Sequence, residues 1–150
     1  MTPLDERFYV SAHLDFDGIE KARCLGFSMV INNRPDHEDD NQIMHRELEQ
    51  HALKLGMSYR WIPLIPGEIE FEQLIALKEA LAAHDGKTIA FCRTGGRSSF
   101  LWSLLAACSD KLQADEVVKK AQSAGFDFSS LHGALEMARM VGCKEAASQF

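Results

Sequence analysis

The sequence has few cysteines, and their spacing is not that of a framework. No two of them form a Cys-x-x-Cys pair in a chain of 150 residues. This spacing argues against a disulfide-stapled fold, and a reducing cytoplasm is the compartment that such cysteine usage predicts. The four cysteines are Cys24, Cys92, Cys108 and Cys143.

Long apolar runs are also missing. The first residues, Met1 to Arg7, lack the apolar core of a signal peptide, and no apolar run approaches the length needed to span a membrane. Internal repeats and low-complexity linkers are absent as well. With 46% hydrophobic and 25% charged residues, the composition is that of a soluble globular protein, and the length predicts a single domain over residues 1–150.

An excess of positive charge is absent, because the formal net charge is -6. Nucleic acids and anionic membranes bind basic surfaces, so we expect neither as a partner. Metal-ligand spacing is missing too. The acidic loop from His37 to Asn41 lacks the ligand spacing and the turn glycine of a hard-cation site, and we interpret it as a solvated loop. We therefore expect neither a metal nor a cofactor.

What the sequence does contain is one unusual stretch, Lys87 to Ser98, followed by an apolar run to Cys108. Thr88 to Phe91 has the β-branched and apolar residues of a buried strand, and the run from Ser98 has apolar residues at helical spacing. The pattern therefore predicts that Cys92 ends a strand and that the following glycines turn the chain into a helix.

This geometry predicts an anion site around Cys92. A helix start and a tight loop both present unpaired backbone N–H groups, and Gly95 and Gly96 allow the backbone to curl around a centre. Arg93 and Arg97 add positive charge, which favours the thiolate of Cys92 over the thiol. The alternative is that Cys92 is a small buried residue without chemistry. We favour a nucleophile with a small anionic substrate, in a chain whose oligomeric state the pattern does not indicate.

Strand and helix patterns alternate along the rest of the chain. The alternation predicts an α/β sandwich with a largely parallel sheet, with Cys92 at the carboxyl edge near Arg34 and the loop 66–70. Cys24 is expected in or near the core. The expected strands are 8–11, 27–31, 57–64 and 88–91, and the expected helices are one capped by Asp17 with Glu20, then 42–55, 71–83, 98–108, one from about Asp115 to Ala124, and one from Ser129 to about Met140.

Five segments together resemble a known bacterial family, the phosphatase-like domain first noted in beta-lactamase-hydrolase-like proteins. The resemblance runs from Phe8 to Leu135. It implies a protein-tyrosine-phosphatase-like three-layer sandwich, with a mostly parallel sheet of about four strands flanked by helices, a nucleophilic Cys92 and an anion-binding loop arginine. The segments are Phe8–Ser11, Val30–Asp36, Ile62–Gly67, Cys92–Ser98 and Ala124–Ser129.

The active-site loop departs from the tyrosine-phosphatase pattern, which has His-Cys, five intervening residues and then Arg. Here Phe91 replaces the histidine, and only four residues separate Cys92 from Arg97. A shorter loop shrinks the ring of N–H donors that would surround the three equatorial oxygens of a phosphate. The loop instead resembles that of rhodanese sulfurtransferases, which surrounds a persulfide. Loop length therefore favours sulfur chemistry.

A general acid for phosphate-ester cleavage is not evident. In phosphatases of this fold the acid is an aspartate on the loop after the third strand, but here that loop has no carboxylate before Glu68 and Glu70. Both are interpreted mainly as exposed acids at a helix start. Sulfane transfer needs no such acid, because its leaving group is already a good anion.

Three functions therefore remain open. The first is a sulfurtransferase that carries a persulfide on Cys92, the second a phosphatase that forms a phosphocysteine, and the third an anion-binding module without turnover. In the phosphatase hypothesis Ser98 stabilises the departing thiolate. The candidate catalytic residues are Cys92, Arg97 and Ser98, the candidate substrate-binding residues are Arg93, Thr94, Gly95, Gly96 and Arg34, and the candidate acids are Glu68 and Glu70.

Overall fold

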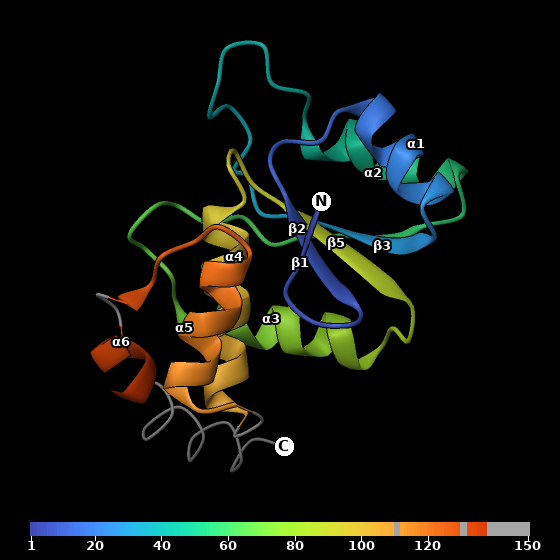
Figure 1. The fold of residues 1–150 in the computed structure, drawn as a ribbon. Coiled ribbons are helices and arrows are strands. Elements are labelled where there is room, and N and C mark those ends of the chain that lie inside the picture. The colour runs from blue at the N-terminus through green and yellow to red at the C-terminus, as the bar shows by residue number, and fades with distance from the viewer. Residues whose placement is uncertain (110–111, 130–131, 138–150) are drawn as a thin grey trace. The chain divides into compact units, whose positions relative to one another are not determined.

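A computed structural model describes residues 1–109, 112–129 and 132–137 of the protein, and the chain divides into two compact units (Figure 1). The first unit, Met1–Ser98, contains the whole sheet, three helices and the start of a fourth. The described residues of the second unit, Ser99–Phe150, contain the rest of that fourth helix and two more. The expectation of a single domain over residues 1–150 stays a prediction.

A mostly parallel sheet of five strands forms the first unit, in the order β1-β2-β5-β3-β4. All neighbouring strands pair in parallel except β1, which pairs with β2 antiparallel. The predicted α/β fold with a mostly parallel sheet is confirmed. The sequence did not indicate β1, because two residues that include a proline show no alternation. The strands are β1 (Thr2–Pro3), β2 (Phe8–Ser11), β3 (Phe27–Asn32), β4 (Ser58–Trp61) and β5 (Lys87–Phe91).

In the first unit the helices lie on both sides of the sheet: α1 and α2 on one side and α3 on the other (Figure 1). A core of buried side chains from α1, α2 and the strands joins the first pair of helices to the sheet. Its centre includes Ile19, Phe27, Leu48 and Phe91. The helices are α1 (Phe16–Cys24), α2 (His45–Lys54), α3 (Phe71–Ala82), α4 (Gly96–Cys108), α5 (Ala114–Ser123) and α6 (His132–Met137).

Two helices begin at other residues than predicted. Asp15, not Asp17, caps α1, because its Oδ1 accepts a hydrogen bond from the Gly18 N–H at 2.8 Å. Helix α2 begins at His45 and not at Gln42, because Gln42 belongs to the preceding loop and donates from Nε2 to the Pro35 carbonyl oxygen at 2.8 Å. Both differences leave the number and order of the helices unchanged.

The strand predicted over Met57 to Leu64 is shorter, because β4 ends at Trp61. Pro63 has no N–H to give to a ladder. The chain still stays next to β3, since Ile62 and Leu64 donate their N–H groups to the carbonyl oxygens of Asn32 and Asn33 at 2.9 and 3.0 Å.

Cys24 is exposed, so the prediction that it lies in or near the core is wrong. Helix α1 buries Ile19 and Ala22. At about 100° per residue, a position two residues after Ala22 faces away from the buried side.

The last predicted helix is seen in part. Helix α6 spans His132–Met137, and Ser129, the predicted cap, donates from Oγ to Asp127 Oδ1 at 2.6 Å. Met140 lies outside the described residues. Across the part of the chain that the structure describes, no helix combines the length and the apolar character needed to cross a membrane.

Candidate active site

The candidate site lies at the carboxyl edge of the sheet, where the parallel strands β2, β5 and β3 end side by side. Phe91 is in register with Ser11 of β2 on one side and with Asn32 of β3 on the other, so the loops after all three strands begin at the same level. Two backbone hydrogen bonds join these loops: Asn33 donates to the Phe91 carbonyl oxygen at 2.8 Å, and His13 donates to the Arg93 carbonyl oxygen at 3.3 Å. The predicted position of Cys92 at the carboxyl edge follows from this register.

Cys92 is buried, with 1% of its surface exposed, but its surroundings are polar. Its Sγ accepts a hydrogen bond from the Gly95 N–H at 3.0 Å. Burial by itself raises the pKa of the thiol, yet the backbone N–H groups of Ser98, Thr94, Arg97 and Gly95 outweigh it and hold the pKa of Cys92 below its ordinary value. The main-chain donors of the loop therefore favour the thiolate form of Cys92 over the thiol.

Gly95 makes this ring possible. Its φ is 93°, in the left-handed region that residues with a Cβ rarely adopt. This conformation turns the N–H of Gly95 back toward Cys92, and the next residue, Gly96, begins α4. Thr94 closes the turn, since its Oγ1 accepts from the Gly96 N–H at 3.3 Å.

Arg97 lies beside the sulfur and already holds an anion. Its Nη1 donates to the Leu64 carbonyl oxygen at 2.7 Å and to Glu38 Oε2 at 2.9 Å, and its Nη2 donates to Glu38 Oε1 at 2.7 Å. The hydrogen bonds to Glu38 are the main cause that raises the pKa of Arg97, and the neighbouring Cys92 raises it further. Arg97 thus presents the two-pronged geometry that binds two oxygens of an oxyanion.

Ser98 contributes its backbone rather than its hydroxyl. Its N–H faces the Cys92 sulfur, whereas its Oγ donates to Asn33 Oδ1 at 2.7 Å. Asn33 is itself buried and donates from Nδ2 to the Ile62 carbonyl oxygen at 2.8 Å. This chain of hydrogen bonds fixes the first turn of α4 to the loop after β3.

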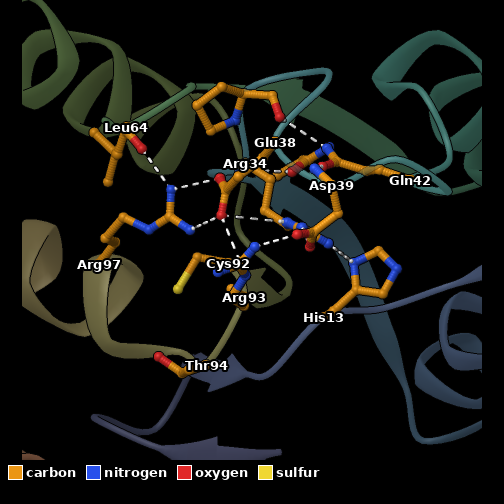
Figure 2. A network of polar contacts seen from close by, with 12 residues as sticks. His13, Arg34, Glu38, Asp39, Gln42, Leu64, Cys92, Arg93, Thr94 and Arg97 are labelled. Carbon is orange, nitrogen blue, oxygen red and sulfur yellow. Dashed lines mark hydrogen bonds and ion pairs between the residues drawn. The ribbon is translucent and has the colours of Figure 1, made fainter. Parts of the chain in front are cut away.

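Two further arginines gather around the neighbouring carboxylate, Asp39. Both Arg34 and Arg93 donate to it from their Nη2 atoms, Arg34 to Oδ2 and Arg93 to Oδ1. Glu38 lies between the groups, with its Oε1 at 3.9 Å from Arg34 Nε and at 3.6 Å from Arg93 Nε. Figure 2 shows the three arginine side chains around the two carboxylates, with the sulfur of Cys92 beside them.

The charges in this cluster are matched. The Arg97 hydrogen bond is the main cause that lowers the pKa of Glu38, against the effect of burial, and Arg34 and Arg93 add to it. The pKa of Asp39 is also lowered: desolvation opposes the shift, and the hydrogen bonds from Arg34 and Arg93 overcome it. Both carboxylates are therefore ionised at neutral pH.

His13, on the loop after β2, completes the cluster. Its Nδ1 lies 3.0 Å from Arg34 Nη1. A guanidinium only donates, so Nδ1 is the acceptor and the ring proton is on Nε2. Burial, followed by the charge of Arg34, lowers the pKa of His13 and keeps the ring neutral.

Residue 37 and residues 39–41 are exposed, as expected of a solvated loop, whereas Glu38 departs from that expectation. The Glu38 side chain is only 18% exposed and is held by Arg97. Glu68 and Glu70, the candidate acids, are exposed, and the described residues show neither side chain in a hydrogen bond or ion pair with the cysteine loop. The nearest carboxylate to Arg97 comes from the loop after β3, not from the loop after β4.

Four residues of the site were not predicted from the sequence: His13, Asn33, Glu38 and Asp39. His13 and Asn33 could be predicted only from their positions in the fold, because each follows a parallel strand that neighbours β5. Charge complementarity would find the others, since two acids near Arg34 face a loop that carries two arginines. Over the same described residues no group of three or more His, Cys, Asp or Glu side chains is arranged to hold a metal ion. The arrangement can bind an oxyanion next to a nucleophilic sulfur.

Comparison with known sequences points to one family. The sequence model of the family described as "Beta-lactamase hydrolase-like protein, phosphatase-like domain" matches residues 1–109. The Beta-lactamase hydrolase-like protein of Xylella fastidiosa is 27% identical over 124 residues, which are 83% of this chain and 29% of that protein. A protein of the same description from Agrobacterium fabrum is 26% identical over the same shares. The chain thus spans under a third of the length of these relatives.

Comparison with solved structures agrees on the fold. The crystal structure of a "putative phosphatase" from Neisseria meningitidis superposes with a TM-score of 0.81 at 28% identity, covering 92% of this chain and 97% of that chain. Tk-PTP in its active form superposes with a TM-score of 0.71 at 18% identity, covering 93% of this chain and 96% of that chain. The second likeness concerns the fold alone.

Proposed function

The chain belongs to the family of beta-lactamase hydrolase-like protein, phosphatase-like domains, and from this premise we propose that it is a cysteine-dependent phosphatase that hydrolyses phosphate monoesters. The sequence alone ranked sulfur transfer first. The two bacterial relatives are named hydrolase-like and the Neisseria meningitidis protein a putative phosphatase, and none of the three is named for sulfur transfer, so the order of the two hypotheses is reversed here.

The observation that carries the proposal is the bidentate pair between Arg97 and Glu38 next to the Cys92 thiolate. A carboxylate presents two oxygens at nearly the spacing of two phosphate oxygens, so this pair marks where a phosphoryl group would sit. An arginine fork that holds an oxyanion beside a nucleophile is the arrangement that phosphoryl transfer requires.

The first chemical step is transfer of the phosphoryl group to sulfur. The Cys92 thiolate attacks phosphorus, a P–S bond forms, and the P–O bond to the leaving alcohol breaks. Arg97 holds two of the equatorial oxygens, and N–H groups of the loop that are freed from the thiolate stabilise the charge. An aryl leaving group departs as a phenolate and needs no proton from the protein, whereas an alkyl one requires an acid worth about 10²- to 10⁴-fold in rate.

The second step hydrolyses the phosphocysteine and regenerates the free enzyme. Water attacks phosphorus of the phosphocysteine, the P–S bond breaks, and inorganic phosphate leaves, with the proton of the water passing to solvent. Cys92 departs as a thiolate because the N–H groups of Gly95 and Ser98 again receive its charge. The Ser98 hydroxyl is occupied by Asn33, so the backbone of Ser98 carries this role.

Sulfur transfer is kept as a second candidate because one observation favours it. Four residues separate Cys92 from Arg97, and the N–H groups of this short loop converge on a single atom, Sγ. A persulfide carries its charge on one terminal sulfur, which such a ring can hold. In that reaction Cys92 attacks the sulfane sulfur of thiosulfate, sulfite leaves, and a thiol or cyanide then takes the sulfur.

One assay decides between the two reactions. Purified protein and the Cys92→Ser variant are each given an aryl phosphate, and separately thiosulfate with cyanide. The proposal expects phosphate release that the substitution abolishes. Thiocyanate formation by the wild type without phosphate release would replace phosphatase by sulfurtransferase, and no turnover of either substrate would leave an anion-binding module.

A further inference from the structure

The arginines of the site form two separate places for an anion, not one. At the first of these places, Arg97 holds the carboxylate of Glu38 through both of its terminal nitrogens. At the second of these places, Arg34 and Arg93 hold the carboxylate of Asp39, one oxygen each. The two carboxylates are neighbours in sequence, so the two places lie side by side at the carboxyl edge of the sheet.

The second place is built into the fold rather than formed by chance at the surface. Arg34 is 4% exposed, and its backbone N–H donates to Asn32 Oδ1 at 2.8 Å, while its carbonyl oxygen accepts from Trp61 Nε1 at 2.9 Å. Its Nη1 is directed by His13. A buried cation with this many fixed contacts is preorganised for an anion.

One N–H donor of the buried Arg34 guanidinium has no hydrogen-bond acceptor among the described residues. This donor is Nε, which is inaccessible to solvent. Its nearest charged neighbour is Glu38 Oε1 at 3.9 Å, which is too long for a hydrogen bond. A buried N–H without an acceptor is rare in a folded protein. The guanidinium of Arg34 thus has its unpaired Nε near Glu38 and its Nη2 on Asp39, and an oxygen of a ligand that replaces the carboxylates would satisfy the Nε.

The charge of the cluster indicates what that ligand would be. Three guanidinium groups are balanced by Glu38, Asp39 and the Cys92 thiolate. If the two carboxylates are displaced, two positive charges remain unmatched, and they are divided between two places. A single phosphate at the first place can displace Glu38, but it leaves Asp39 at the second place with Arg34 and Arg93.

We propose that the site takes a substrate with two neighbouring anionic groups, whose places Glu38 and Asp39 occupy in the free protein. The inference rests on the proposed function, because the first group is the phosphoryl group attacked by Cys92. The second group is a phosphate or a carboxylate attached close to it. Arg34 and Arg93 bind this second group and determine specificity.

The loop that carries the two carboxylates is tied through its backbone at its base and again at Asp39, whose N–H donates to Gln42 Oε1 at 3.2 Å. Asp36 accepts a hydrogen bond from the His45 N–H at 2.8 Å, and Gln42 donates to the Pro35 carbonyl oxygen at 2.8 Å. The tip between these ties is held to the site by the arginine contacts of Glu38 and Asp39. A doubly anionic substrate can replace both contacts at once, whereas a singly anionic one replaces only one of them.

Binding to the Cys92→Ser protein tests the inference without turnover. Inorganic phosphate, inorganic pyrophosphate and phosphoglycolate are titrated by calorimetry. We expect pyrophosphate or phosphoglycolate, or both, to bind at least about tenfold more tightly than phosphate, which is the effect of one additional charge-assisted contact. Tighter binding of pyrophosphate alone identifies the second group as a phosphate, and tighter binding of phosphoglycolate alone identifies it as a carboxylate.

Two substitutions in the same background locate the second place. Arg93→Ala should weaken pyrophosphate binding by about tenfold and phosphate binding by a clearly smaller factor, and Asp39→Asn should strengthen pyrophosphate binding. Arg93 and Asp39 are both substantially exposed, so neither variant should unfold. The controls are Arg60→Ala, which removes an exposed arginine of β4, and Asp40→Asn, which removes the next acid of the loop.

The outcomes separate the two proposals. If pyrophosphate and phosphoglycolate bind no more tightly than phosphate while the wild type still hydrolyses an aryl phosphate, the inference of a second anionic group is overturned and the proposed function stands. The inference is equally overturned if Arg93→Ala weakens phosphate and pyrophosphate by the same factor. If phosphate does not bind and the aryl phosphate is not hydrolysed, the proposed function itself fails.

Discussion

The carboxylate of Glu38 meets the guanidinium of Arg97 edge to edge, with Oε1 at 2.7 Å from Nη2 and Oε2 at 2.9 Å from Nη1. The two residues are 59 positions apart and come from the loop after β3 and the first turn of α4. Because Arg97 also neighbours Cys92, an internal carboxylate occupies the place next to the nucleophile. An oxyanion substrate therefore competes with a part of the protein itself.

Glu38→Gln should relieve this competition. The neutral amide binds a guanidinium more weakly than a carboxylate does, so inorganic phosphate should inhibit the variant with a constant about tenfold lower than that of the wild type. The measurement is phosphate inhibition of aryl phosphate hydrolysis, with Asp40→Asn as the control. An unchanged inhibition constant would mean that Glu38 does not occupy the substrate place in solution.

Arg97→Ala should reduce kcat/KM for an aryl phosphate by about 10- to 150-fold, which corresponds to a charge-assisted hydrogen bond of about 1.5 to 3 kcal/mol. Arg97→Lys should restore only part of the rate, because a lysine cannot bind two oxygens with a planar fork. Steady-state kinetics at several phosphate concentrations measure both. Normal turnover by the alanine variant would place the anion elsewhere.

The reaction of Cys92 with iodoacetamide should persist to a lower pH than an ordinary thiol allows, because the loop N–H groups lower its pKa below the usual value. Gly95→Ala should raise the pKa of Cys92, since a residue with φ of 93° is strained with a Cβ and the N–H at 3.0 Å moves away from the sulfur. Mass spectrometry of the Cys92 peptide follows the rate against pH.

The control for this pH profile is Gly56→Ala, which introduces a Cβ at φ of 76° between α2 and β4, away from the cysteine loop. Both variants should lose similar stability, but only the Gly95 variant should shift the profile. A shift of equal size in both would indicate a general loss of structure instead of a lost hydrogen bond.

The stability of the protein should fall in acid partly through Glu38. Its pKa in the folded protein is lowered from the ordinary value of 4.5, mainly by the Arg97 hydrogen bond, so the stabilisation is present above 4.5 and is lost as the pH falls through the lower folded value. Glu38→Gln should make the free energy of unfolding less dependent on pH in that acid range. Urea unfolding at several pH values below 5 compares the two proteins, and parallel curves would contradict the ion pair.

Asn33→Ala should lower the free energy of unfolding by about 1 to 3 kcal/mol, because it leaves the buried Ser98 hydroxyl and the Ile62 carbonyl oxygen without partners. Asn41→Ala removes the same side chain from the exposed part of the loop and should change stability by less than about 0.5 kcal/mol. Urea unfolding measures both, and equal effects would show that the Asn33 hydrogen bonds contribute nothing specific.

The elements that local pattern determines were predicted well. The strands over 8–11 and 88–91, the helix from Phe71 and the turn from Cys92 into α4 all follow from alternation, periodicity and the glycines at the turn. The predicted helix boundaries were wrong where a side chain binds a residue outside the helix. Gln42 was predicted to begin a helix, but its side chain binds the Pro35 carbonyl oxygen and the residue stays in the loop.

The tertiary pairings of charged residues were beyond the sequence. Residues 37–41 form a polar, acidic loop in isolation, and only the register of β3 against β5 places Glu38 and Asp39 over the arginines of the cysteine loop. The same reasoning explains why Glu68 and Glu70 were chosen as candidate acids. The choice was based on the loop after β4, whereas the carboxylates that reach the site follow β3.

The most direct test of the account is the covalent intermediate on Cys92. Wild-type protein is mixed with an aryl phosphate, quenched in the steady state and digested, and the peptide that contains Cys92 is weighed by mass spectrometry. The account predicts that this peptide gains the mass of one phosphoryl group in the wild type. In Cys92→Ser, both the added mass and the release of phosphate should be absent. Phosphate release at the wild-type rate by Cys92→Ser, or a Cys92 peptide that gains sulfur from thiosulfate and never a phosphoryl group, would contradict it.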